Sequence, residues 1–148
     1  MIREALIEDL DTLADHYDNL LKEILPNEFS QDEYNSMRDP YIERLRGDDI
    51  GGYVAIEGDE VIGSIVWYHV KGILNLKSCG DSIYIHCLWV DDDCRSRGHG
   101  KKLMDAAISY AKENSTTLKL KPSSQKAISL YKKMGFKECA PIMKLNLR

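Results

Sequence analysis

The segment between Ser82 and Ala111 constrains the fold more than any other part of the chain. Residues Ser82 to Val90 are rich in aromatic and branched side chains and predict a buried β-strand. A turn containing Gly98 and Gly100 follows, and apolar residues at helical spacing then predict a helix that starts near Gly98. A strand that passes through a glycine turn into a helix indicates an α/β fold, in which helices pack on a sheet.

The other periodic segments surround this unit and show no internal repeat or linker. Pro40 is expected to break or kink the second helix, and Gly135 to cap the last helix in the left-handed conformation. We expect helices at residues Glu8 to Leu25, Ser30 to Arg46, Gly98 onward, and Ser124 to Met134. We expect strands at residues Ile2 to Ala5, Tyr53 to Glu57, Val61 to Val70, Ser82 to Val90, Thr117 to Lys121, and Met143 to Leu147. The 148 residues are therefore expected to form one domain with a mixed α/β sheet.

The amino-terminal residues and the cysteines bear on the compartment. Residues 1–10 contain three acidic side chains and no long apolar run, so we expect neither a signal peptide nor a membrane span. The four cysteines lack metal-ligand spacing and are interpreted as reduced thiols. We therefore expect a cytoplasmic protein that binds neither a metal nor a membrane.

Charge is distributed unevenly along the chain. Residues 1–94 contain 7 Lys and Arg against 21 Asp and Glu, a net charge of −14, whereas residues 95–148 contain 13 against 3, a net charge of +10. A basic half suits a phosphorylated ligand and an acidic half could attract a cationic substrate, although solvated helix faces explain much of the acidic excess. Nucleic-acid binding is not expected, because no aromatic residues interleave with the lysines and the whole chain is acidic.

The glycine turn has the chemistry of an anion site. Gly98 and Gly100 allow the backbone to approach a ligand, and the free N–H groups of a helix start bind anions. A dinucleotide fingerprint is excluded because Leu103 stands where its third glycine would be, and the P-loop spacing is absent. A tight turn with solvated charges is the alternative. Four cations at this helix start oppose the helix dipole, and a bound polyanion would remove the conflict: Arg95, Arg97, Lys101 and Lys102.

Two motifs then point to a family. Arg95-Ser-Arg-Gly98-His-Gly100 resembles the (R/Q)xxGx(G/A) motif of the GNAT (GCN5-related N-acetyltransferase) family. The segment from Ser124 to Phe136 is similar to that family's N-x-x-A-x-x-L-Y-x-x-x-G-F pattern, except that Ser124 replaces the Asn. The resemblance covers nearly the whole chain and is specific from about Ile83 to Phe136. It implies a single domain with a mixed, mostly antiparallel sheet of about six to seven strands, flanked by about four helices.

The resemblance also implies roles for individual residues in binding acetyl-CoA, the expected co-substrate. The backbone of Leu88, Trp89 and Val90 would pair with the pantetheine arm, and the turn amides from Arg97 to Lys102 would hold the pyrophosphate. Tyr131 would protonate the departing CoA thiolate, with a core tyrosine as the alternative. The full set of expected co-substrate contacts is Leu88, Trp89, Val90, Arg95, Arg97, Gly98, His99, Gly100, Lys101, Lys102, Ser124 and Ala127.

Direct transfer requires a neutral amine, and a base must therefore be found. Many members of the family place a glutamate two residues before the Leu of the Leu-x-Val segment, and His86 stands there. We take His86 as the leading candidate for the base, with Tyr84 and Asp81 as relays, while a structural histidine remains the alternative.

The family shapes its acceptor site with the region after the first helix. The acidic residues of that region favour a cationic acceptor and are Glu28, Asp32, Glu33, Asp39, Glu43, Asp48 and Asp49. The acceptor amine could belong to a small molecule or a peptide, and the oligomeric state, including a homodimer, stays open. A module that binds acyl-CoA without turnover is the competing function.

Overall fold

The computed structural model describes residues 1–74, 80–114, 116–139 and 142–147. Cys79 lies outside the described residues. The elements are β1 (Ile2–Glu4), η1 (Ile7–Asp9), α1 (Leu10–Ile24), α2 (Gln31–Leu45), β2 (Ile50–Glu57), β3 (Glu60–Val70), β4 (Ser82–Val90), η2 (Asp92–Cys94), α3 (His99–Glu113), β5 (Thr117–Leu120) and α4 (Gln125–Lys133). These bounds agree with the predicted elements to within a few residues, apart from the two corrections below.

The strands form one sheet in the order β1-β2-β3-β4-β5. The β4–β5 pair is parallel and the other pairs are antiparallel, which confirms the mixed, mostly antiparallel sheet. The hairpin between β2 and β3 turns at Gly58, whose φ of 64° favours glycine. The described residues form five strands, so the predicted six to seven was too many.

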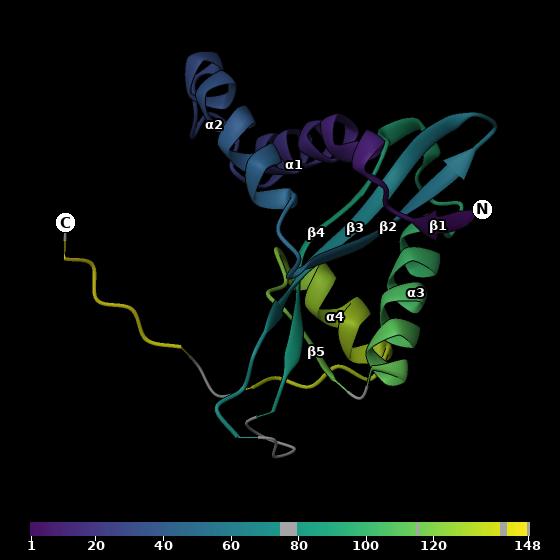
Figure 1. Ribbon diagram of the computed structural model, residues 1–148, viewed down its shortest axis with the longest axis vertical. Coiled ribbons are helices and arrows are strands. Elements are labelled where there is room, and N and C mark those ends of the chain that lie inside the picture. Colours follow the sequence, from purple (N-terminus) through teal and green to yellow (C-terminus); the bar gives the residue numbers. More distant parts are fainter. Residues whose placement is uncertain (75–79, 115, 140–141, 148) are drawn as a thin grey trace.

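Helices cover both faces of the sheet (Figure 1): α1 and α2 lie over one face, and α3 and α4 over the other. Each face has its own apolar cluster. The α1/α2 cluster is centred on Leu10, Leu13, Leu45, Val54, Val66, Cys87 and Trp89. The α3/α4 cluster is centred on Ala55, Ile62, Ile65, Trp67, Ile83, Ile85, Leu103, Met104 and Ala107. The sheet is thus the middle of three layers.

Of the two outcomes expected at Pro40, a break or a kink, the break is wrong, because α2 runs as one helix from Gln31 to Leu45. Proline removes one backbone N–H donor from a helix interior and usually distorts it. Here both halves of the helix are anchored on the protein: Tyr34 and Leu45 are buried, and Tyr41 packs against the α1/α2 cluster. Tertiary packing on both sides of the proline outweighs the lost hydrogen bond.

The predicted strand at Met143 to Leu147 was also wrong, since residues 142–147 belong to no strand. Met143 is 95% exposed, Leu145 81% and Leu147 87%. The alternation of apolar and polar residues that predicted the strand is present, but an extended segment becomes a strand only beside another backbone. Residues 142–147 are not among the strands of the described sheet.

Within the described residues, no helix has the length and apolar character needed to cross a membrane. The same residues contain no group of three His, Cys, Asp or Glu side chains that could hold a metal ion. Cys87, Cys94 and Cys139 are free thiols.

Candidate active site

The strands β4 and β5 separate partway along the sheet. β5 pairs with β4 only from Ser82 to Ile85, whereas β4 continues to Val90. Residues 86–90 therefore have β3 on one side and no strand of the described chain on the other. Backbone N–H and C=O groups along this open edge need partners from outside the sheet. The edge can accept an extended, hydrogen-bonding ligand.

A β-bulge lies where the two strands separate. Two adjacent residues of β3 pair with Ile85 and Cys87, so His86 is an extra residue in β4. Ile85 faces the α3/α4 cluster before the bulge, and Leu88 and Val90 pack against the same cluster after it. Alternation after Ile85 places His86 on the face of α1 and α2, and the bulge puts Cys87 on that same face.

His86 sits among aromatic side chains. Its Nε2 lies 3.1 Å from the Tyr41 hydroxyl oxygen, and its ring centroid lies 4.4 Å from that of Tyr17. The rings of Tyr17 and Tyr41 stack with centroids 4.7 Å apart. Burial lowers the pKa of His86, and the nearby positive charge of Arg44 lowers this pKa further. A neutral imidazole with a lone pair is therefore the prevailing form of His86 at pH 7.

The start of α3 lacks a side-chain cap. Its N-cap is Gly98, with a φ of 83° in the left-handed region, and no side chain accepts from the first turn. Ser96 also has a positive φ, of 65°, so two residues of this turn adopt an uncommon conformation. A Cβ on Gly98 would meet nothing within 4 Å, and one on Gly100 would come only to 3.9 Å from Val90 Cγ2. The packing of the chain itself leaves open space over both glycines.

The cations around this turn are mostly engaged with carboxylates. Arg95 donates to Glu23 of α1 at 2.7 Å and to the carbonyl of Val90 at 2.9 Å, and its guanidinium lies 4.6 Å from the Trp89 ring centroid. Arg95 therefore ties α1 to the end of β4. Arg97 pairs with Glu57 at 2.8 Å, His99 with Glu57 at 3.2 Å, and Lys101 with Asp105 at 2.8 Å.

The start of α4 is capped by its own serine. Ser124 Oγ accepts a hydrogen bond from the backbone N–H of Ala127 at 3.1 Å. α4 ends at Lys133, and Gly135 follows the C-cap Met134 with a φ of 99°, as predicted for a left-handed residue at the helix end. Tyr131 is half-buried beside Phe136, with ring centroids 5.5 Å apart, and burial raises the pKa of its hydroxyl. Tyr131 therefore stays protonated at neutral pH and can donate a proton.

A buried polar contact joins α1 to the sheet just before the turn. His16 is 3% exposed, and its Nδ1 lies 2.7 Å from the hydroxyl oxygen of Ser64 on β3. Its Nε2 lies 3.8 Å from Oδ1 of Asp91, which also accepts from the indole N–H of Trp89 at 3.0 Å. Burial lowers the pKa of His16, against the opposing effect of Asp91.

The structure places the predicted site residues on the two faces of the sheet. Tyr131 packs against the α3/α4 cluster together with Leu88 and Val90. His86 lies on the α1/α2 side against Tyr17 and Tyr41, so the structure places Tyr131 and His86 on opposite faces of the sheet. Asp81 precedes β4 and accepts from the Gly72 N–H at 2.8 Å. Five residues of strand, roughly 16 Å, separate Asp81 from His86, which disfavours Asp81 as a direct relay.

Sequence reasoning missed the surroundings of His86 and His16. Tyr84 stacks on Tyr68 with centroids 5.2 Å apart, whereas the ring contacts of His86 come from Tyr17 and Tyr41. These tyrosines are distant in sequence from β4, and no local spacing links them to it. Tyr17 lies within the helix predicted from Glu8 to Leu25, and Tyr41 within the helix predicted from Ser30 to Arg46.

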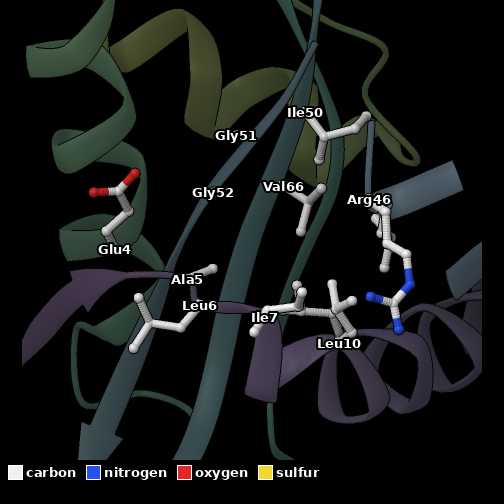
Figure 2. A pocket seen from close by; sticks show the side chains of 12 residues that line it. Glu4, Ala5, Leu6, Ile7, Leu10, Arg46, Ile50, Gly51, Gly52 and Val66 are labelled. Carbon is white, nitrogen blue, oxygen red and sulfur yellow. The ribbon is translucent and has the colours of Figure 1, made fainter. Parts of the chain in front are cut away.

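A cavity of about 270 Å³ lies elsewhere (Figure 2), and none of the predicted site residues line it. Figure 2 shows apolar side chains around it, including Leu6, Ile7 and Leu10, with the Arg46 side chain beside them. Gly51 and Gly52 of β2 also line the cavity. This cavity lies beside α1 over β1, β2 and β3, and its lining includes Val66, which pairs with Cys87 of β4.

Comparison with known proteins gives a consistent result. Residues 15–136 match the sequence model of the acetyltransferase (GNAT) family. A protein of Sulfurisphaera tokodaii described as an N-alpha-acetyltransferase is 28% identical over 144 residues, which cover 93% of this chain and 80% of the relative.

Solved structures agree in fold. A GCN5-related N-acetyltransferase from Ralstonia eutropha has a TM-score of 0.82 at 23% identity, covering 99% of this chain and 97% of that one. A predicted acetyltransferase from Clostridium acetobutylicum, solved with acetyl-CoA, has a TM-score of 0.81 at 20% identity, covering 99% and 96%.

Proposed function

Because this chain belongs to the acetyltransferase (GNAT) family, an acetyl-CoA-using family of N-acetyltransferases, we propose that it acetylates the α-amino group of a peptide. Residues 1–148 would act as one acetyltransferase domain. The observation that carries the proposal is the uncapped start of α3 beside the open edge of β4. We place the reaction in the cytoplasm, which the three free thiols among the described cysteines support.

The open edge and the uncapped helix fit the two parts of acetyl-CoA. The N–H groups at the start of α3 would bind the pyrophosphate, since the helix supplies no internal acceptor for them and Gly98 and Gly100 leave space above. The backbone of residues 88–90 would hydrogen-bond the amides of the pantetheine arm. Arg97, His99 and Lys101 are engaged with carboxylates, and pyrophosphate would compete for them.

Tyr131 would serve as the general acid. Its raised pKa keeps the proton on the hydroxyl until a thiolate forms nearby. As the amine nitrogen bonds to the acetyl carbon, the carbon–sulfur bond breaks and the sulfur takes the electron pair. The Tyr131 hydroxyl would then donate its proton to that sulfur. Ser124 would help by fixing the start of the helix that holds Tyr131.

The properties of His86 favour an α-amine over a lysine side chain as the acceptor. An α-amine has a pKa of about 7.7–8.0 and is neutral in roughly one molecule in seven at pH 7, against about one in 2,500 for a lysine-like amine. A histidine with a lowered pKa is a weak base, so it suits the acceptor that needs less help. The similarity to an N-alpha-acetyltransferase supports the same choice.

A small cationic amine is the second candidate acceptor, because of the acidic residues after α1. Three of the seven are already engaged in the protein: Glu33 accepts from the Ser30 N–H at 2.6 Å, Asp49 pairs with Arg44 at 2.7 Å, and Glu43 lies 3.7 Å from Arg46. The charges of Asp49 and Glu43 are therefore partly neutralised by arginine, which weakens the attraction for a cation.

The test is an acceptor series at fixed acetyl-CoA, measured by release of free thiol. It compares a peptide with a free amino terminus, the same peptide blocked at that terminus but containing lysine, and a polyamine. We expect the first to react fastest. Faster reaction of the polyamine or of the lysine-containing peptide would contradict the assignment of an α-amine acceptor. If no amine in a broad series caused thiol release, the non-catalytic acyl-CoA-binding module would be favoured instead.

Co-substrate binding is tested separately by thermal melting. A ligand that binds only the folded state at a hundredfold excess over its dissociation constant stabilises it by about 2.7 kcal/mol. Acetyl-CoA and CoA should raise the melting temperature, and NAD and ATP should raise it much less. No shift with any acyl-CoA would reject the binding site.

A further inference from the structure

The open edge of β4 presents only alternate backbone groups. The Asp91 N–H donates to the Ile62 carbonyl of β3 at 2.8 Å, so these two residues form a hydrogen-bonded antiparallel pair. Such pairs alternate along two strands, and Trp89 is therefore the next residue whose backbone groups face β3. The N–H and C=O groups of Leu88 and Val90 point the other way, to the edge that has no strand among the described residues.

Arg95 already engages one of these edge groups. Its Nε donates to the Val90 carbonyl at 2.9 Å. Its Nη1 and Nη2 donate to the two carboxylate oxygens of Glu23 on α1, at 2.7 Å and 3.4 Å. Oδ1 of Asp92 also lies 3.3 Å from Nη2. All three guanidinium nitrogens thus have partners within the protein, and one of those partners belongs to the backbone of the open edge.

The guanidinium of Arg95 lies on the α1 side of the sheet. It stacks over the indole ring of Trp89, 4.6 Å from the ring centroid, and Trp89 is a buried member of the α1/α2 cluster. The open space over Gly98 and Gly100 lies instead at the start of α3, which covers the other face (Figure 1). The Arg95 guanidinium is therefore on the opposite face of the sheet from the helix whose start would bind the pyrophosphate.

A second contact of α1 reaches the same end of β4. His16 Nε2 lies 3.8 Å from Oδ1 of Asp91, and that oxygen accepts from the Trp89 indole N–H at 3.0 Å. Glu23 follows His16 on α1 by about two helical turns, so both side chains leave the same face of the helix. α1 is thus attached to the end of β4 at two points, and the Arg95 contact is the one that also reaches the strand's open edge.

We propose that Arg95 is a positioning residue for acetyl-CoA and does not bind its pyrophosphate. Arg95 ties the Val90 carbonyl to α1, and the Leu88 N–H, the Leu88 C=O and the Val90 N–H are left for the pantetheine arm. Without the guanidinium, the Val90 carbonyl loses its partner and the end of β4 loses this attachment to α1. This inference rests on the co-substrate site proposed above and is independent of the acceptor.

The first experiment measures the dissociation constant of CoA by calorimetry for Glu23→Gln and for its matched control, Asp92→Asn. Each variant removes one carboxylate from Arg95 and one negative charge from the region of the turn, but only Glu23 joins Arg95 to α1. Glu23→Gln should raise Kd at least about threefold relative to Asp92→Asn, because the β4 edge loses its tie to α1. If Arg95 were a phosphate ligand, removal of Glu23 would free it and lower Kd, and that result would overturn the proposal.

The second experiment compares Arg95→Lys with Arg95→Gln. Lysine can act as a point charge for a phosphate but lacks the planar fork that reaches the Val90 carbonyl and Glu23 together. Both variants should therefore raise the Kd of CoA at least about threefold. Adding Glu23→Gln to Arg95→Gln should have no further effect, because Glu23 acts through the guanidinium. Wild-type affinity in Arg95→Lys would assign Arg95 to the phosphates and overturn the proposal.

Thermal melting of each variant without ligand separates positioning from simple support of the fold. A residue that only supported the fold would lower the melting temperature and leave the Kd of the folded protein unaltered, and this outcome would reject the proposal. Failure of the wild-type protein to bind CoA would reject the co-substrate site together with this inference. A wild-type protein that binds CoA but acetylates no peptide would contradict only the proposed acceptor.

Discussion

Two helix starts of this protein solve the same problem in opposite ways. Both α3 and α4 follow a strand and a short turn, and both begin with backbone N–H groups that the helix cannot satisfy. At α4, Ser124 accepts one of these N–H groups at 3.1 Å. At α3, Gly98 offers no side chain, and its φ of 83° is one that most other residues avoid.

The difference separates a helix that stabilises the fold from one that is left open to a ligand. A serine cap stabilises a helix by about 1 kcal/mol relative to alanine but by only a few tenths of a kcal/mol relative to glycine, so the glycine at α3 costs little stability. The first N–H groups of α3 have no side-chain cap, and cationic side chains lie beside them, where positive charge opposes the helix dipole. We infer that α3 binds the co-substrate and that α4 is a fixed support for Tyr131.

The largest expected effect comes from removing the hydroxyl of Tyr131 on the capped helix α4. Tyr131→Phe keeps the ring and removes the hydroxyl. General acid catalysis typically contributes about 10² to 10⁴-fold, so kcat should fall at least about tenfold while KM for acetyl-CoA and the melting temperature stay nearly constant. Tyr53→Phe, which alters another half-buried tyrosine packed on the same cluster, is the control. A normal kcat in the Phe variant, with chemistry rate-limiting, would mean that Tyr131 is a packing residue and not the general acid.

The second effect concerns the open helix start. Gly100→Val should raise KM for acetyl-CoA at least about tenfold, because a branched side chain would fill the space over the turn where the phosphates would lie. Folding should change by less than about 0.5 kcal/mol, since valine is no worse than glycine in a helix and nothing crowds this position.

Gly58→Ala gives the converse behaviour and serves as its control. Gly58 has a φ of 64° in the hairpin turn, so alanine there should lower stability by about 1–2 kcal/mol without altering KM. An unaltered KM in folded Gly100→Val protein would mean that the turn is only a connection between β4 and α3.

The third effect tests the capped start directly. Ser124→Ala should lower the free energy of unfolding by about 1 kcal/mol, because the N–H of Ala127 loses its acceptor. Ser30→Ala at α2, where Ser30 Oγ accepts from the Glu33 N–H, should behave similarly. The comparison would break if Ser124→Ala left stability intact and instead raised KM for acetyl-CoA, because Ser124 would then be a ligand contact.

The smallest effect tests the contact that holds α1 near the turn. Burial lowers the pKa of His16 in the folded protein, so the unfolded chain binds a proton more readily. Stability therefore falls as the pH drops through 6.5, and this histidine contributes at most about 0.7 kcal/mol between pH 7 and pH 6. His16→Asn should flatten the pH dependence of chemical unfolding in this range. If the unfolding free energy of the variant depended on pH as steeply as that of the wild type, His16 would not account for the pH dependence.

Local features of the sequence predicted most of the fold. The β4 bounds follow from the run of branched and aromatic residues between Ser82 and Val90, and the Gly135 cap follows from glycine's tolerance of positive φ. Both signals arise within a few residues of the element that they define. The motifs around Gly98 and Tyr131 also predicted the family correctly.

Features that depend on distant contacts were not predictable. The helix through Pro40 survives because Tyr34 and Leu45 are buried against other elements. The bulge at His86 appears only when β4 is aligned with β3. The strand predicted after Met143 failed for the same reason, since its pairing partner is not a local property of the sequence.

The brevity of the β4–β5 contact affects how the protein folds. β2, β3 and β4 are consecutive antiparallel strands, whereas β5 joins by four parallel residue pairs after α3 has crossed the sheet. To pair in parallel, two strands separated by a helix must first close a long loop, and the entropy of loop closure is lost before the stabilising contacts form. Such steps are slow. Amides of β5 should consequently exchange with solvent deuterium sooner than those of β3, which has neighbours on both sides. The chain would thus form the point where β4 and β5 separate last during folding and lose it first during partial opening.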